Sequence, residues 1–366
     1  MRALRRPTGR QRRGVLSPIR VALDAMGGDR APEVPVRGAL SALRELPGDF
    51  EIILVGDEAR IQPLLHRARS APGRVSVRHA SETIGMDESP ITALRRKRDS
   101  SIAVGLALQK AGEADAFVSA GNTGAVMAAA LTTLGRIERI QRPAIVTVFP
   151  TAREPCVVLD AGANVDCKPS HLAQFALMGH FYARDVLGRE RPRVALLSIG
   201  EEPGKGNEAV VAAHALLAAS GLDFAGNVEG RDILRGDTDV VVCDGFVGNV
   251  LLKFGESVKD FLGDAIRDEL AGSVRARLGA LLMKPAFQSL KRRIDYAEYG
   301  GAPLLGVDGV VIIGHGGSSV KAFRNAVRVA ATAVERDMVR HIEEAVRSSD
   351  PGSEAPEGTA ARTRSA

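Results

Sequence analysis

Residues 116–125 read AFVSAGNTGA, a short apolar run that ends in a loop of glycine and small polar residues. The run at 116–119 has the composition of a strand buried on both faces, and the alanine-rich stretch 123–134 after the loop is expected to form a helix. A strand that leads into a helix is the repeating unit of α/β folds with parallel sheets. This stretch therefore predicts the class of the fold.

The same alternation recurs along the chain, where nearly all-apolar runs are followed by longer Ala- and Leu-rich stretches. It predicts a largely parallel sheet with helices on both faces, which is a three-layer α/β/α architecture. The expected strands are 19–23, 51–55, 75–78, 116–119, 144–149, 156–159, 193–199, 240–243 and 310–313. The expected helices are 33–45, 58–66, 91–111, 123–134, 171–187, 208–219, 247–271 and 320–347.

The composition is that of a folded protein with a substantial core. Of the 366 residues, 45% are hydrophobic and 25% are charged, which suffices for a large domain without disulfides or metals. We expect an Arg-rich arm at 1–18, one domain at 19–347 and a tail at 348–366. The arm and the tail are expected to be disordered, because the mixture of small and polar residues in the tail offers little to bury.

The net charge of +5 originates in the arm, which contains no acidic residue. Without its arginines, 43 basic residues face 44 acidic ones. Proteins that bind nucleic acid carry basic patches on the folded body or aromatic platforms for stacking, and only 4% of this chain is aromatic. The sequence therefore predicts no nucleic-acid partner. The arginines of the arm are Arg2, Arg5, Arg6, Arg10, Arg12 and Arg13.

Membrane insertion and export are also disfavoured. No stretch approaches the roughly 20 apolar residues that span a bilayer. The arm lacks the apolar segment of a secretory signal, so we expect a disordered extension or a misassigned start codon. The odd number of cysteines (Cys156, Cys167 and Cys243) and their spacing predict no metal site and are typical of a reducing cytoplasm.

Loops rich in glycine follow six of the expected strands. In an open parallel sheet the ligand crevice lies outside the carboxyl ends of the strands, so we expect the six loops at one edge of the sheet, around a phosphate-like anion. For any single loop, ordinary turn and helix-cap roles are the alternative. The loops are DAMGGD (24–29), SAGNTGA (119–125), DAGANVDCKP (160–169), GEEPGKGNE (200–208), CDGFVGN (243–249) and GHGGSS (314–319).

These loops do not match several common catalytic patterns. The segment GKGNE lacks the lead and the Ser/Thr of a Walker loop, and GNTGA does not reproduce the dinucleotide motif GxGxxG. The sequence favours a structural thiol at Cys167 over a nucleophile that forms a thioester. Lys168 and Lys205 are well placed to pair with phosphate, although each is also compatible with a solvated surface charge.

The six loops, in this order, resemble those of the PlsX family of phosphate acyltransferases, and the resemblance runs from about residue 19 to 342. The resemblance implies the fold of phosphate acetyltransferases and of isocitrate and isopropylmalate dehydrogenases. It implies transfer of an acyl group from acyl carrier protein to inorganic phosphate, without metal or organic cofactor, at the start of bacterial phospholipid synthesis. It also implies a cytoplasmic homodimer on the inner face of the cell membrane, where a glycerol-3-phosphate acyltransferase consumes the acyl phosphate.

That chemistry assigns roles to residues of the loops. A phosphate oxygen attacks the thioester carbonyl, so the site must hold the anion and stabilise an oxyanion. Lys205 and Lys168 are expected to supply the charge, and His315 either protonates the leaving thiolate or caps the following helix. Neutral hydrogen bonds are expected from Asn122, Thr123, Asn164 and Asn249. The remaining expected site residues shape the phosphate loops or orient the lysines and the backbone: Asp24, Gly27, Gly28, Asp166, Glu208, Asp244 and Gly316.

Two surfaces complete the sequence-based hypothesis. The run Arg95, Arg96, Lys97 and Arg98 is compatible with electrostatic docking of the acidic carrier protein, or with an ordinary solvated helix face. The segment 254–299 is amphipathic, and it is compatible with a membrane-surface helix, a dimer interface or both. The competing functions are a phosphate acetyltransferase acting on coenzyme A thioesters and a non-catalytic protein that binds phosphate or a lipid surface.

Overall fold

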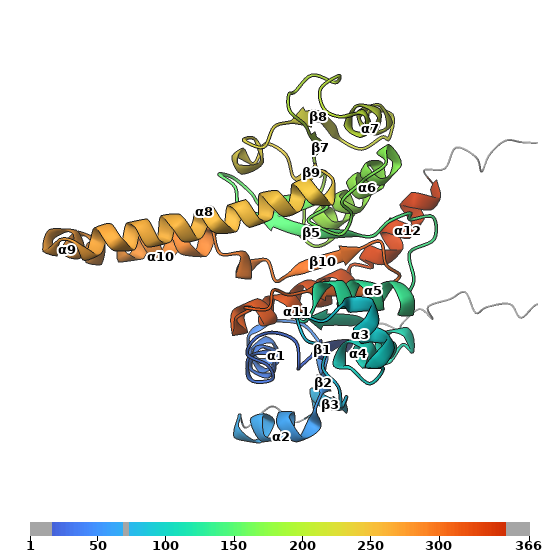
Figure 1. The fold of residues 1–366 in the computed structure, drawn as a ribbon, viewed down its shortest axis with the longest axis vertical. Helices are drawn as coiled ribbons and strands as arrows, with labels where there is room; N and C mark the ends of the chain where they lie inside the picture. Colours follow the sequence, from blue (N-terminus) through green and yellow to red (C-terminus); the bar gives the residue numbers. More distant parts are fainter. Residues whose placement is uncertain (1–16, 69–72, 349–366) are drawn as a thin grey trace, which may run out of the picture.

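The computed structural model describes residues 17–68 and 73–348 (Figure 1). The predicted disordered arm up to residue 16 and the tail from residue 349 lie outside the described residues. In the described part, the strands are β1 (Ile19–Asp24), β2 (Phe50–Gly56), β3 (Val75–His79), β4 (Ala116–Ser119), β5 (Ala144–Phe149), β6 (Cys156–Leu159), β7 (Val194–Leu197), β8 (Phe224–Val228), β9 (Val240–Val242), β10 (Ala302–Leu305) and β11 (Val310–Ile313).

The helices alternate with the strands, as the sequence predicts. They are α1 (Glu33–Glu45), α2 (Glu58–Arg67), α3 (Pro90–Arg96), α4 (Ser101–Lys110), α5 (Thr123–Thr133), α6 (Pro169–Asp185), α7 (Glu208–Ala218), α8 (Gly245–Ala271), α9 (Val274–Leu282), α10 (Lys284–Arg293), α11 (Val320–Glu335) and α12 (Met338–Ser348), with 3₁₀ turns η1 (Ile233–Arg235) and η2 (Tyr296–Glu298).

All strands of the described residues belong to one mixed sheet, in the order β3-β2-β1-β4-β11-β10-β5-β6-β9-β7-β8. Strands β3, β2, β1, β4 and β11 are parallel to one another, and so are β6, β9, β7 and β8. Between these groups, the pairs β11–β10, β10–β5 and β5–β6 are antiparallel. Because the number of reversals is odd, the two groups of parallel strands run in opposite directions.

Helices cover both faces of the sheet, which confirms the predicted three-layer architecture (Figure 1). Alternating residues of a strand enter different cores: Val21 and Leu23 belong to the cluster that includes α1 and α11, whereas Ala22 belongs to the cluster that includes α4. Both sets are buried and apolar, as expected for strands covered on two sides. A third, smaller cluster joins β6, β7 and β9 to the first turns of α8.

Four local predictions were wrong. The helix expected at 91–111 is two helices, because Asp99 accepts hydrogen bonds from Ser81 and Ser100 begins a new helix. The helix expected at 320–347 breaks at Asp337, whose φ of 52° is left-handed. Strands β8 and β10 were not predicted, because Gly226 and Pro303 are residues that strands usually exclude.

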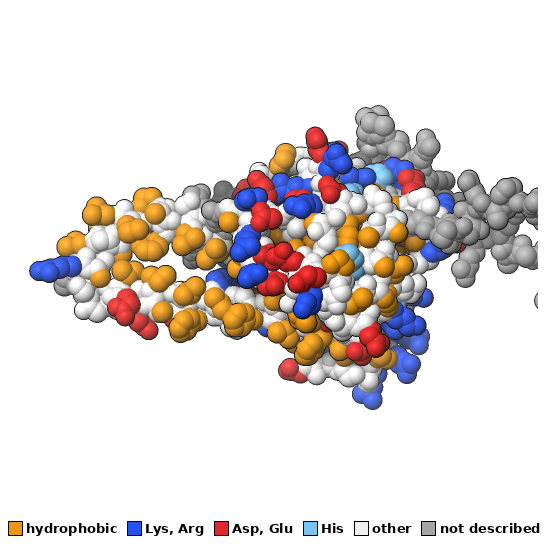
Figure 2. Space-filling model, turned by 90° about the horizontal axis from the view of Figure 1, so that it is seen from above, with side chains coloured by type: hydrophobic (Ala, Val, Ile, Leu, Met, Phe, Trp, Pro, Cys, Tyr) orange, Lys and Arg blue, Asp and Glu red, His pale blue; other side chains and the backbone are white. Residues whose placement is uncertain are grey.

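A helical arm protrudes from the body of the molecule. Figure 1 shows α8 running outward from the sheet, with α9 at the far end and α10 folding back beside α8. Figure 2 shows hydrophobic side chains along both limbs of this arm. The exposed apolar residues here include Phe254, Leu262, Leu281, Leu282 and Met283. The predicted amphipathic segment is therefore helical and leaves much of its apolar surface uncovered in the isolated chain.

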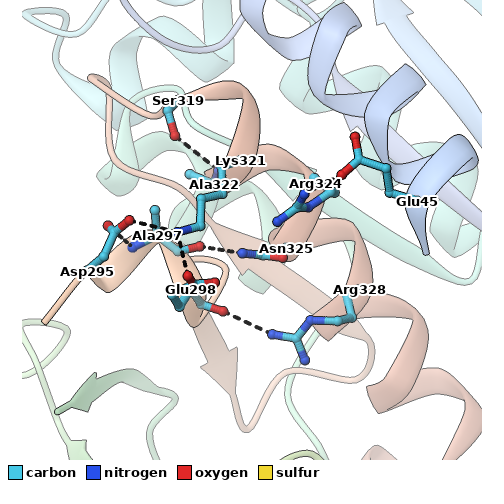
Figure 3. A network of polar contacts seen from close by, with 10 residues as sticks. All are labelled: Glu45, Asp295, Ala297, Glu298, Ser319, Lys321, Ala322, Arg324, Asn325 and Arg328. Carbon is cyan, nitrogen blue, oxygen red and sulfur yellow. Dashed lines mark hydrogen bonds and ion pairs between the residues drawn. The ribbon is translucent and has the colours of Figure 1, made fainter. Parts of the chain in front are cut away.

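Polar contacts fix the returning end of the arm to α11 (Figure 3). The Lys321 Nζ lies 2.9 Å from the Asp295 carboxylate and 2.5 Å from that of Glu298. The buried Asn325 side chain donates to the Ala297 carbonyl at 2.7 Å, and Arg328 donates to the Glu298 carbonyl at 3.1 Å. The ion pairs lower the pKa of Asp295 and raise that of Lys321, although partial burial opposes both shifts.

Candidate functional site

The six glycine-rich loops form two groups rather than one. Loops 24–29, 119–125 and 314–319 follow β1, β4 and β11, which are parallel to one another. Loops 160–169, 200–208 and 243–249 follow β6, β7 and β9, which run the opposite way. The expectation of a single edge was wrong, because it assumed one strand direction across the whole sheet.

Asp24 organises the first group from inside. Its buried carboxylate accepts hydrogen bonds from the Met26 N–H at 2.9 Å and the Ser119 hydroxyl at 2.6 Å, which ties the ends of β1 and β4 together. Burial raises the pKa of Asp24, while these hydrogen bonds oppose the shift. A Cβ at Gly27 would stand 2.7 Å from Asp24 Oδ2, so only glycine fits. Asp24 therefore positions the backbone of these loops.

The third loop of this group closes against the first. Gly28 has a left-handed φ of 101°, and the following Asp29 N–H donates to the Gly316 carbonyl at 2.9 Å. His315 is exposed, and its Nδ1 accepts from the Gly317 N–H at 3.1 Å. The alternative that His315 caps the next helix was wrong, because Ser319 is the N-cap of α11.

The side chain of Asn122 is engaged in hydrogen bonds within the protein and is not an available donor to a ligand. Its side-chain oxygen accepts from the Ala125 N–H at 3.1 Å and caps α5. Its amide donates to three carbonyls of the loop after β3, at 3.0–3.2 Å. The residue is buried, whereas the neighbouring Thr123 is exposed. The structure thus leaves Thr123 accessible and commits Asn122 to the protein itself. The three carbonyls belong to Gly85, Met86 and Glu88.

Asp160 plays the same part in the second group. Its buried carboxylate accepts from the backbone N–H groups of 162–164 and of Ile145, at 2.7–3.1 Å. The Asn164 side chain also donates to Asp160, at 2.8 Å, and to the Pro143 carbonyl, at 2.7 Å. Burial is the largest influence on the pKa of Asp160 and raises it. Asn164 is therefore committed internally, like Asn122.

A small hollow of about 130 Å³ lies between the three loops of the second group. Two carboxylates border it: Asp166 is exposed, and Asp244 accepts from the Val247 N–H at 2.8 Å as the N-cap of α8. Because both side chains are acidic, an anion in this hollow needs nearby cations. The lining residues are Val165, Asp166, Cys167, Leu172, Asn207, Ala209, Val210 and Asp244.

Cys167 lines this hollow but is poorly suited to attack. Partial burial and the negative charges of Asp160 and Asp244 raise the pKa of the thiol to about 12. At neutral pH the thiol is therefore protonated, and the thiolate is the nucleophilic form. These surroundings favour the structural interpretation of Cys167.

The required cations stand on two of these loops. Lys168 immediately precedes α6, and Lys205 lies in the loop before α7; both are exposed. Neither forms an ion pair with another described residue. Asn249 is exposed near the start of α8, and its side chain would lie 3.6 Å from a Cβ at Gly162. Glu208 is exposed at the first position of α7. The second group therefore offers positive charge and a neutral amide.

The basic run at the end of α3 is only partly available to a partner. Lys97 is half-buried, with its Nζ 2.5 Å from Glu88 and 2.7 Å from the Thr83 carbonyl. Lys97 therefore holds the loop in place. A docking role for Lys97 stays a prediction. The exposed cations of the run are Arg95, Arg96 and Arg98.

Sequence reasoning missed two residues that shape these loops. Asp160 is buried at the first position of the loop 160–169. It follows directly after a predicted strand, as Asp24 does, and this shared position is the sequence signal that could have identified it. Asn207 lines the hollow and caps α7 by accepting from the Val210 N–H at 2.9 Å. An Asn immediately before an Ala- and Val-rich helix is a recognisable N-cap pattern.

No helix among residues 17–68 and 73–348 is long and apolar enough to cross a membrane. The same part of the chain contains no cluster of three His, Cys, Asp or Glu side chains that is arranged to hold a metal ion.

Comparison with known proteins identifies close relatives. A family model described as "Fatty acid synthesis protein" matches residues 19–341. A phosphate acyltransferase from Heliobacterium modesticaldum is 55% identical over 327 residues, which cover 89% of this chain and 97% of that protein. A phosphate acyltransferase from Moorella thermoacetica is 53% identical over 324 residues, which cover 88% and 94%.

Solved structures share the fold at lower identity. A phosphotransacetylase from Streptococcus pyogenes gives a TM-score of 0.62 at 19% identity, covering 87% of this chain and 94% of that one. A phosphotransacetylase from Staphylococcus aureus gives a TM-score of 0.56 at 17% identity, with the same coverage. At these identities the likeness concerns the fold alone.

Proposed function

We propose that this chain, which belongs to the phosphate acyltransferase family of fatty acid synthesis proteins, transfers the acyl group of an acyl carrier protein thioester to inorganic phosphate. The family makes it an enzyme that uses phosphate as acyl acceptor. The observation that carries the proposal is the pair of exposed lysines, Lys168 and Lys205, on two of the three strand-end loops that border the hollow.

In the proposed reaction, a phosphate oxygen attacks the thioester carbonyl and forms the new C–O bond. The tetrahedral oxyanion then collapses, the C–S bond breaks, and the thiolate of the carrier's prosthetic group leaves and takes up a proton. Phosphate is already ionised at neutral pH, so the enzyme's main contributions are orientation and charge stabilisation.

We assign the charge stabilisation to Lys205 and Lys168, with Asn249 as a neutral donor. Asp166, Asp244 and Glu208 stand near these groups and orient them, because direct contact with phosphate would bring like charges together. Asp244 already fulfils such a role as the N-cap of α8.

The first group of loops would serve the substrate differently. Thr123, His315 and the backbone at Gly316 are the accessible groups there. Proton transfer from His315 to the leaving thiolate requires that its Nε2 face the second group, since its Nδ1 is engaged by its own loop. A His315→Asn variant with unchanged pH dependence of turnover would remove this role.

Carrier-protein recognition is proposed for the exposed arginines of the α3 end. An acidic partner is attracted to such a cluster before contact, and the effect weakens with salt. Lys97 contributes through Glu88 to the shape of this surface rather than to its charge.

We propose that the helical arm, α8 to α10, brings the enzyme to its place in the cell. Its exposed Leu281, Leu282 and Met283 at the outer end fit a cytoplasmic homodimer that rests on the inner face of the cell membrane, where anionic lipid attracts basic residues such as Lys284. The acyl phosphate would then pass to a glycerol-3-phosphate acyltransferase in the same membrane, which is the first committed stage of phospholipid synthesis.

One assay tests the reaction against its alternatives. The protein is incubated with phosphate and either an acyl carrier protein thioester or the matching coenzyme A thioester, and acyl phosphate is measured. Product from the carrier thioester supports the proposal. Product only from coenzyme A indicates a phosphate acetyltransferase type of enzyme, and no product from either indicates a protein that binds phosphate or lipid without turnover.

A further inference from the structure

The segment before β5 reaches the edge of the sheet where the second group of loops lies. Strand β5 runs antiparallel to β6, so its first residues lie beside the last residues of β6. The Ile145 N–H donates to the Asp160 carboxylate at 3.1 Å, and the Ala161 N–H donates to the Ile145 carbonyl at 2.9 Å. The residues just before β5 therefore share this edge with loop 160–169, although they precede a strand instead of following one.

Arg142 stands in this segment between two anchored neighbours. On one side, the Pro143 carbonyl accepts from the Asn164 side chain at 2.7 Å. On the other side, the side-chain oxygen of Gln141 accepts from the Ser170 hydroxyl at 3.1 Å. The backbone at Arg142 is thereby tied both to the loop after β6 and to the first turn of α6.

The side chain of Arg142 is exposed, and it lies near Lys168. Lys168 directly precedes the turn of α6 to which Gln141 is bonded, and its N–H donates to Nδ1 of the buried His171 at 3.2 Å. Burial, followed by the positive charges of Arg142 and Lys168, lowers the pKa of His171, so both cations act on the same ring. Neither cation forms an ion pair with another residue of the described part of the chain.

These surroundings differ from those of ordinary surface arginines in this protein. Arg153 and Arg340, for example, are exposed and pair with carboxylates at 2.6 and 2.8 Å. Arg142 has a lysine near it instead, and two neighbouring cations repel each other. An anion held against both would remove this repulsion. A phosphate group fits, because a guanidinium can donate to two of its oxygens while an ammonium meets a third.

The position also adjoins the proposed reaction site. Leu172 lines the hollow, and it points about 200° away from Ser170 around the axis of α6. Arg142 and the hollow therefore flank the first turn of α6, at whose start Lys168 stands. An anion bound by both cations would lie beside the hollow without having to enter its acidic border.

We propose that Arg142 is a phosphate-binding residue that acts together with Lys168 at the start of α6. The inference rests on the proposed function for the identity of the anion, and it adds a third cation to the second group of loops. Two substrates carry the required chemistry. They are inorganic phosphate and the phosphodiester that joins the carrier protein to its prosthetic group.

The test compares Arg142→Ala and Arg142→Lys with the control Arg191→Ala. Arg191 is an exposed arginine before β7, at the opposite edge of the sheet from loop 200–208. Acyl phosphate formation is measured at varied phosphate and at varied carrier thioester, and again with a pantetheine thioester, which has no phosphate group.

Arg142→Ala should raise one of the KM values about tenfold, because charge-assisted hydrogen bonds to the anion are lost. Arg142→Lys should recover part of the loss, since it keeps the charge but not the planar fork. The control should change no KM. A higher KM for phosphate with either donor assigns Arg142 to inorganic phosphate. A higher KM for the carrier thioester, with the pantetheine thioester unaffected, assigns it to the phosphodiester.

Unchanged KM values in Arg142→Ala, or equal changes in Arg191→Ala, overturn the inference. Calorimetric titration with inorganic phosphate and with free phosphopantetheine separates it from the proposed function. If the wild type binds either compound more tightly than Arg142→Ala does but makes no acyl phosphate, only the proposed function fails. If an active wild type and Arg142→Ala bind both compounds equally, or neither protein binds them, only the inference fails.

Discussion

Lys205→Ala is expected to abolish most of the activity while leaving the fold intact. The side chain is exposed and forms no ion pair with a described residue, so its removal leaves no buried charge without a partner. The free energy of unfolding should change by less than about 0.5 kcal/mol. In the transition state, however, a charge-assisted donor to an oxyanion contributes about 3 kcal/mol, which corresponds to roughly a 100-fold loss in rate.

The assay is steady-state formation of acyl phosphate, with denaturant unfolding of the same preparations. Lys253→Ala is the matched control, because Lys253 is an exposed lysine on α8 whose partner is Glu256 at 2.9 Å. We expect the control to keep near-normal kcat. Near-normal kcat in Lys205→Ala, or an equal loss in both variants, would refute the assignment. A loss confined to the KM for phosphate would show that Lys205 binds the ground state and transition state equally.

Three further predictions address the Cys167 thiol, the arginines at the end of α3 and the outer end of the helical arm. Cys167→Ser should retain appreciable activity, and rapid quenching should trap no acyl-enzyme, because a thiol with a pKa of about 12 is protonated at neutral pH; a covalent acyl-cysteine would replace direct attack by a two-step mechanism. Charge reversal of Arg95 and Arg96 should raise the KM for the carrier thioester several-fold, mainly at low salt, and spare a short thioester without the protein; equal effects on both donors would make the run structural. Changing Leu281 and Leu282 together to Glu should release the enzyme from anionic vesicles and leave soluble turnover largely intact; an inactive monomer would instead place these residues in a dimer interface.

Local chemistry was readable from the sequence because it depends on neighbours along the chain. Strand ends and glycine-rich loops follow from patterns only a few residues long. The class of the fold follows from the same alternation. The direction of the sheet's two halves does not, because it is set by the three antiparallel pairs β11–β10, β10–β5 and β5–β6.

Side-chain roles failed where the partners are distant in sequence. The amide of Asn122 donates to carbonyls that lie 34–37 residues earlier in the chain. Asn164 reaches the carbonyl of Pro143, and Lys97 reaches Glu88. A polar residue in a glycine-rich loop looks equally available to a ligand in each case, and only the folded arrangement shows which donors are already engaged.

The engaged donors also indicate how the second group of loops must stabilise charge. Backbone N–H groups are the usual oxyanion donors of acyl-transfer enzymes. Here those of residues 162–164 donate to Asp160, and that of Val247 donates to Asp244. These carboxylates give the loops a fixed shape but occupy the N–H groups that would otherwise face a ligand. Side-chain cations must therefore supply most of the stabilisation in this group, and this is why the loss expected for Lys205→Ala is large although the residue is an exposed lysine in the isolated chain.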